Sequence, residues 1–319
     1  LTSLVGSEMC IRDRSKTVRS TRQCTFEELV NIGTNNAKKA LMLGTTTLEA
    51  KSGYGLNLES EIAILSAYQL VNSRSNCDIH STWLGAHDFP TNTTREDYID
   101  ELIHKQLPEV CRLGIARWAD VFCEPGWFTV DESKEILLAS NKLGLRPRAH
   151  VDEFVDSNGL AMAADIGCVS ADHVACSSDD ARSKADAAGV MQTFLPGTQY
   201  VMGMIDFPPL KSCLENSWAF SIASDFNPNC NSISMPFVGS LATHRCGIDP
   251  IAALVASTRN PATTFSDGEP PGCGSLTEGG NASLNILTTN SVEGWCQSPG
   301  MNPISVSYTH LRAHETSQH

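Results

Sequence analysis

The chain has 319 residues, of which 41% are hydrophobic and 18% charged, and its formal net charge is -13 at pH 7. This length suits one large domain, or a barrel with an appendage, that buries a sizeable core. The acidic balance, without a basic stripe, argues against a nucleic-acid or anionic-membrane partner. No apolar run reaches the length of about 18 residues that a membrane span needs.

The residue patterns at both ends of the chain are unlike those of natural proteins. The strings LVGSEMCIRDR (4–14) and VSYTHLRAHET (306–316) resemble translated sequencing adapter. A codon choice exists for which the reverse complement of the first string encodes most of the second. We therefore predict that residues 1–14 and 306–319 are artefacts and leave them out of the fold prediction. The alternative is a pair of natural polar tails.

The 12 cysteines include no C-x-x-C pair and lie among ordinary α/β segments. This pattern is typical of reduced thiols in a cytoplasmic protein and argues against a thiolate metal site. We expect most of these cysteines to be small buried packing residues.

From Thr45 onward, short apolar strands alternate with amphipathic helices. Capping boxes predict helix starts at Thr25 to Glu28 and at Thr129, and Gly144 predicts the end of the second helix. The candidate strands are Thr45 to Ala50, Asp78 to Leu84, Ala119 to Cys123, Arg146 to Val151, Val169 to His173, Val190 to Leu195 and Ser221 to Asp225. The candidate helices are Leu58 to Asn72, Arg95 to Leu113, Val130 to Leu143, Asn158 to Ile166, Ser178 to Ala188, Leu210 to Trp218 and Pro250 to Thr258, after one that reaches about Leu43.

This α/β alternation predicts a TIM-like (β/α)8 barrel over residues 15–260 that lacks strand one. A doubly wound sheet is the alternative, but no G-x-G-x-x-G or P-loop motif follows any strand. After Asn260 the chain becomes rich in Gly, Pro, Ser and Asn, with one late strand at Leu284 to Thr289. We interpret residues 261–305 as the remnant of a β-rich accessory domain whose strand has no partner in this chain.

Polar residues that follow the predicted strands are candidate site residues, because barrel enzymes build their active sites at the carboxyl ends of strands. Tyr54 follows strand two, where its ring could project over the site or pack on neighbouring loop residues. His87 follows strand three, where the alternative is a structural loop histidine.

The strongest candidates follow strands five, six and eight. His150 ends strand five with Glu153 three residues on, and His173 ends strand six. Neutral imidazole is a common ligand for Zn²⁺ or Fe²⁺, and a second histidine can accept a proton from water. Asp225 ends strand eight and is followed by Asn227 and Asn229. These three could complete a metal site and bind a polar substrate, or form an Asx-type turn.

The chain resembles the amidohydrolase superfamily, and within it the imidazolonepropionase family. The resemblance lies in TTTLEAKSGYGL, TWLGAHDFP, ADVFCEPGWF, RAHVDEF, VSADHV, LPGTQYVMG and SDFNPN, in order over about Thr17 to Leu287. It implies hydrolysis of the ring amide of 4-imidazolone-5-propanoate to N-formimidoyl-L-glutamate in histidine degradation, with one divalent metal, Zn²⁺ or Fe²⁺.

The resemblance also implies a role for each candidate residue. His150 and Asp225 would be metal ligands, and Glu153, His173 and Asp225 would be catalytic. Substrate contacts would come from the side chains of Tyr54, His87, Glu153, Asn227 and Asn229.

The sequence departs from the family pattern at two points. Asn229 and Cys230 follow Pro228 where the family continues with Gly, and the H-x-H pair of strand one is absent. We therefore expect a fragment with little activity and weak metal binding. The alternatives are another amidohydrolase, such as a cyclic amidase or deaminase, and a metal-free barrel that binds a ligand. We also expect a cytoplasmic protein with a small-molecule substrate, and a homodimer.

Overall fold

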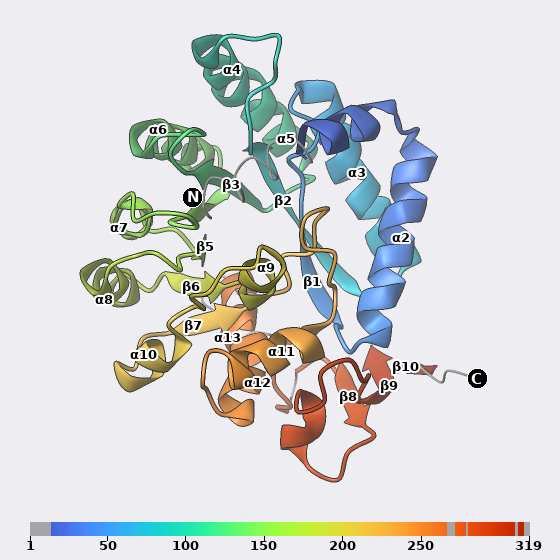
Figure 1. Ribbon diagram of the computed structural model, residues 1–319. Helices are drawn as coiled ribbons and strands as arrows, with labels where there is room; N and C mark the ends of the chain where they lie inside the picture. Colours follow the sequence, from blue (N-terminus) through green and yellow to red (C-terminus); the bar gives the residue numbers. More distant parts are fainter. Residues whose placement is uncertain (1–13, 267–271, 279, 310–311, 316–319) are drawn as a thin grey trace. The chain divides into compact units, whose positions relative to one another are not determined.

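The computed structural model describes residues 14–266, 272–278, 280–309 and 312–315, so most of the segment 1–14 lies outside the described residues. The chain divides into two compact units, and Figure 1 labels the helices and strands of both. Unit 1 comprises residues 1–34, 49–74 and 79–190, and unit 2 comprises residues 35–48, 75–78 and 191–319. No described helix is long and apolar enough to cross a membrane.

Unit 1 is a succession of βα pairs. Its strands follow one another in chain order, β1-β2-β3-β4-β5, and β2 to β5 pair in parallel. The strands are β1 (Thr47–Lys51), β2 (Asp78–Ala86), β3 (Trp118–Cys123), β4 (Arg146–Val151) and β5 (Ser170–His173). The helices are α3 (Leu58–Arg74), α4 (Arg95–Glu101), η1 (Leu102–Gln106), α5 (Leu107–Leu113), α6 (Val130–Lys142), α7 (Gly159–Ile166) and α8 (Asp179–Ala187).

Unit 2 contains a parallel strand pair and a separate antiparallel sheet. The pair is β6 (Met191–Phe194) with β7 (Phe220–Ile222), and the sheet has the order β10-β9-β8. That sheet consists of β8 (Leu284–Leu287), β9 (Ile304–Thr309) and β10 (Arg312–Glu315). The helices are α9 (Pro196–Val201), α10 (Leu210–Glu215), α11 (Met235–His244), α12 (Pro250–Ser257), α13 (Arg259–Ala262), η2 (Thr263–Phe265) and η3 (Val292–Trp295).

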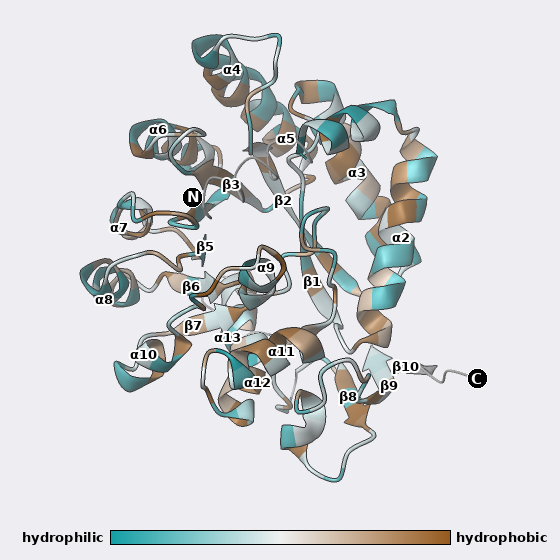
Figure 2. Cartoon of the chain, in the orientation of Figure 1, coloured by the Kyte–Doolittle hydropathy of each residue, from teal (hydrophilic) through white to brown (hydrophobic). Residues whose placement is uncertain are grey.

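Local capping explains several helix boundaries. Thr129 and Glu132 form the predicted capping box at the start of α6, with each side chain bonded to the other residue's backbone N–H. Thr25 and Glu28 form the same kind of capping box at the start of α2 (Phe26–Met42). Figure 2 shows hydrophilic and hydrophobic segments alternating along this helix. Gly144 follows α6 at a φ of 92°, which favours glycine. These capping predictions are confirmed.

Each unit has its own buried aromatic core. In unit 1, the core side chains that are at most 2% exposed include Trp83, Trp118, Tyr98, Phe122 and Phe128. In unit 2, Trp295 packs over Gly239 of α11, where an added Cβ would lie 2.3 Å from the indole carbon Cη2. Glycine is therefore required for this close approach.

Four predictions about secondary structure need correction. The strand predicted to reach Asp225 ends at Ile222, because Asp225 adopts a left-handed φ of 48°. The predicted helix from Arg95 to Leu113 contains the π-helical turn η1. Helices α9 and α11 were not predicted at all. Finally, β8 has a partner in this chain, since it pairs antiparallel with β9, part of which lies in the adapter-like segment 306–319.

Candidate active site

Strand register gathers the polar side chains of unit 1. Phe122 of β3 lies opposite His150 of β4, and His150 lies opposite Asp172 of β5. Asp120 precedes Phe122 by two residues, so its side chain points to the same face of the sheet. The register thus brings Asp120, His150 and Asp172 together from three neighbouring strands.

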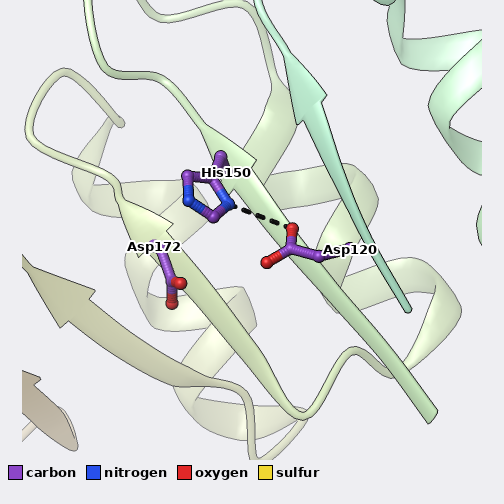
Figure 3. Close-up of side chains that lie close together, drawn as sticks. All are labelled: Asp120, His150 and Asp172. Atoms are coloured by element: carbon purple, nitrogen blue, oxygen red, sulfur yellow. Dashed lines mark hydrogen bonds and ion pairs between the residues drawn. The ribbon is translucent and has the colours of Figure 1, made fainter. Parts of the chain in front are cut away.

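These three buried residues each offer a ligand atom, and the atoms lie within 4.8 Å of one another. The dashed line in Figure 3 joins His150 Nδ1 to Asp120 Oδ1 at 3.0 Å, and Asp172 lies on the adjacent strand. Imidazole nitrogen and carboxylate oxygen are ligands that suit divalent metals. The residues present therefore fit a divalent metal.

Lys51, at the end of β1, supplies positive charge to the same cluster. Its Nζ lies 2.7 Å from Asp120 Oδ2, 3.2 Å from Asp172 Oδ2 and 2.8 Å from Glu49 Oε1. Arg148 of β4 lies 3.4 Å from Glu49 Oε1 through its Nε. Three carboxylates therefore face two permanent cations and one imidazole.

The pKa values follow from this arrangement. Burial by itself lowers the pKa of His150, but the charge and hydrogen bond of Asp120 outweigh it and raise the pKa to about 9. Burial by itself raises the pKa of Asp120, yet His150 and Lys51 hold it well below the usual range. In this arrangement His150 is an imidazolium at neutral pH, so metal binding would release its proton.

His173 lies beside this cluster, at the end of β5. Its ring centroid is 5.4 Å from that of His150, and its Nδ1 is 3.7 Å from Glu153 Oε1. The three side chains of His150, Glu153 and His173 are buried. His173 adopts a φ of 72°, a strained conformation of the kind that functional sites retain. The structure thus brings together three of the predicted residues.

Tyr54 and His87 form a second small group in unit 1. Their rings contact edge to face with centroids 5.1 Å apart, and His87 Nδ1 lies 2.9 Å from the carbonyl oxygen of Gly53. Burial holds the pKa of His87 well below its usual range, so the ring is neutral. His87 also contacts Phe122, which in turn contacts His150, with centroid separations of 5.9 and 6.4 Å.

Asp225 belongs to unit 2, where it lies three residues beyond β7. Its Oδ2 accepts a hydrogen bond of 2.5 Å from Thr198 Oγ1. The Asn227 side chain closes the following turn, donating to the Asp225 carbonyl and accepting from the backbone N–H of Asn229 and Cys230. This is the Asx-type turn that the sequence left open as an alternative.

Sequence reasoning missed several charged residues of the site, namely Glu49, Lys51, Asp120, Arg148 and Asp172. Asp120 gave a usable signal, since a lone carboxylate within the apolar strand WADVFC requires a buried partner. The partners themselves could not be found without the strand register.

Solved structures share this fold, and one of them is named an amidohydrolase. A variant of the Arthrobacter aurescens atrazine chlorohydrolase, complexed with zinc and atraton, has a TM-score of 0.73 at 12% identity, covering 98% of this chain and 77% of its own. An adenosine deaminase from Xanthomonas campestris with bound zinc has a TM-score of 0.67 at 14% identity, over 92% and 71% of the two chains. The predicted fold class, an incomplete TIM-like amidohydrolase barrel, is confirmed.

Curated relatives narrow this class to one family. The imidazolonepropionase of Symbiobacterium thermophilum is 38% identical over 278 residues, which are 86% of this chain and 65% of that protein. The Halobacterium salinarum enzyme is 36% identical over 299 residues, which are 92% of this chain and 71% of that protein. No protein-family model matches the chain. The chain belongs to the imidazolonepropionase family, and it spans about two thirds of the length of these relatives.

Proposed function

We propose that this chain is the larger part of a cytoplasmic enzyme of L-histidine degradation. The enzyme hydrolyses the cyclic amide of 4-imidazolone-5-propanoate to N-formimidoyl-L-glutamate. The observation that carries the proposal is the placement of His150, Glu153 and His173 in one buried group. This buried group lies in a chain that is 32–38% identical to named imidazolonepropionases.

His150 and Asp225 are the proposed metal ligands, together with an H-x-H pair that this sequence lacks. The proposed metal is Zn²⁺ or Fe²⁺, because an imidazole and carboxylate donor set suits both ions. When bound, such an ion polarises the amide carbonyl and lowers the pKa of water towards about 7.

The remaining residues are proposed to handle protons and bind substrate. The imidazole of His173 takes the proton from the attacking water and returns it to the leaving nitrogen, and Glu153, 3.7 Å away, orients that ring. Tyr54 and His87 contact the imidazolone. Asn227 and Asn229 bind its carboxylate arm, although the Asn227 amide already bonds to its own turn.

A comparison of two proteins tests this function: the chain itself, and a version to which an N-terminal segment with an H-x-H strand has been added. We expect the extended protein to form N-formimidoyl-L-glutamate and the chain alone to show little activity and weak metal binding. A folded His173→Asn variant of the extended protein is the matched control and should be inactive.

Substrate panels separate the alternatives. Hydrolysis of cyclic ureas or aminopyrimidines by the extended protein, without turnover of the imidazolone, would indicate a different amidohydrolase. One tightly held metal ion per copy of the unextended chain would contradict the proposed ligand set. The expected homodimer stays a prediction, which analytical ultracentrifugation can test.

A further inference from the structure

Glu124 follows the last residue of β3, and its side chain is only 2% exposed. Its Oε1 accepts hydrogen bonds from two consecutive backbone N–H groups, a short one from Glu153 and one of 3.4 Å from Phe154. Its Oε2 is buried and has no hydrogen-bond partner among the described residues. A single oxygen atom therefore ties the end of β3 to the loop that follows β4.

The rest of this loop is held by a different carboxylate. Asp152 Oδ1 accepts from the backbone N–H groups of Ser157 and Gly159, at 3.0 Å each, and Oδ2 accepts from that of Leu160 at 3.1 Å. The two carboxyl groups thus divide the loop, with Glu124 bonding to its beginning and Asp152 to its end. The Glu153 side chain projects from the part that Glu124 holds.

Burial disfavours the charged form of the Glu124 carboxyl group. Burial raises its pKa to about 8, although the hydrogen bonds from Glu153 and Phe154 oppose this rise. The shift favours the neutral acid, whose carbonyl oxygen still accepts both hydrogen bonds. An amide side chain has the same shape and keeps the carbonyl acceptor.

We propose that Glu124 is a positioning residue that holds the backbone of Glu153 so that the Glu153 carboxylate faces His173. Without this acceptor, the buried backbone N–H of Glu153 and the half-buried one of Phe154 would lose their partner, and the chain would move to find another. The catalytic consequence rests on the proposed function, whereas the backbone restraint does not.

Amide hydrogen exchange of the chain tests the restraint directly. In Glu124→Leu we expect exchange at Glu153 and Phe154 to accelerate at least tenfold, with Gly159 and Leu160 within threefold of the unsubstituted chain. In Glu124→Gln all four amides should stay within threefold, because the amide carbonyl replaces Oε1. Unchanged exchange at Glu153 and Phe154 in the leucine variant, or equal acceleration at all four amides, would overturn the restraint.

A matched control is available in the same unit. Glu61 is also fully buried, and it accepts from the backbone N–H groups of Gly53, Gly55 and Leu56. Glu61→Leu should accelerate exchange at those amides while Glu153 and Phe154 keep their protection. Accelerated exchange at Glu153 in this control would mean that general destabilisation explains the Glu124 result, and would count against the proposal.

Kinetics of the extended protein test the consequence for Glu153. Glu124→Leu should lower kcat at least tenfold with KM within threefold, and Glu124→Gln should restore kcat to within threefold. A wild-type kcat in the leucine variant would overturn the positioning role. If the unsubstituted extended protein does not turn over the imidazolone, the proposed function fails, and the exchange result still decides whether Glu124 holds the loop.

Discussion

The charged cluster of unit 1 and the Asp225 turn of unit 2 are built in different ways. Lys51 and Asp120 are 69 positions apart in the chain and meet only because β1, β2 and β3 are neighbours in one sheet. In unit 2, Asn227 bonds to residues two and three positions away. Pairing between strands that are distant in sequence therefore positions the buried charges of unit 1, whereas local hydrogen bonds shape the Asp225 turn of unit 2.

The largest expected effect comes from Lys51→Met. The substitution keeps the aliphatic stem but removes the cation between Asp120 and Asp172, so both carboxylates lose a buried partner. Removing one partner of a buried ion pair costs about 3–5 kcal/mol. We expect about 3 kcal/mol in urea unfolding, near the lower limit, because the Lys51 side chain is 20% exposed.

The matched control is Lys184→Met, which breaks an exposed ion pair with Asp165. Exposed pairs contribute about 0–1 kcal/mol. Similar unfolding free energies for the two variants would remove the distinction between the buried cluster and an ordinary surface pair.

A smaller effect is expected from Asn227→Ala, which removes three hydrogen bonds from a half-buried turn. We expect a loss of about 1–2 kcal/mol, since hydrogen bonds contribute about 0.5–1.5 kcal/mol each and water replaces some of them. Asn227→Asp keeps the acceptor and should lose about half as much. A loss larger than that of Lys51→Met would reverse the comparison between the two regions.

Glu132 of unit 1 makes both a long-range contact, with Arg95, and a local one, with Thr129. Its contribution to the free energy of unfolding should depend on pH. The hydrogen bond from Arg95 lowers its pKa to about 2, with further bonds from Thr129, against a smaller opposing effect of burial. Because the folded pKa lies below the unfolded value of about 4.3, this stabilisation is complete above about pH 5. It is lost as the pH falls towards about 2.

Unfolding of Glu132→Gln at several pH values measures this effect. The stability difference from the unsubstituted chain should be about 1 kcal/mol at neutral pH and vanish near pH 2. Arg95→Met separates the contributions, because it removes the bond across 37 positions and keeps the local capping box. A difference that persists unchanged at acidic pH would show that the charge of Glu132 contributes nothing.

The sequence alone determined the βα order, the capped helix starts and the strand-end histidines, because each depends on neighbouring residues in the chain. It also indicated the family through a series of short motifs. It did not determine where the strand before Asp225 ends, since a left-handed φ overrides an apolar pattern. Nor did it reveal the pairing of β8 with β9, which joins segments about twenty residues apart.

Only the tertiary structure placed Asp120, Lys51 and Glu124. Each is an ionisable residue with a partner on another strand or loop, so no local pattern distinguishes it from a solvated surface group. Parallel register determines which side chains share a face, and burial then makes their pairing obligatory. The sequence therefore named His150, Glu153 and His173, and the fold supplied the charges that surround them.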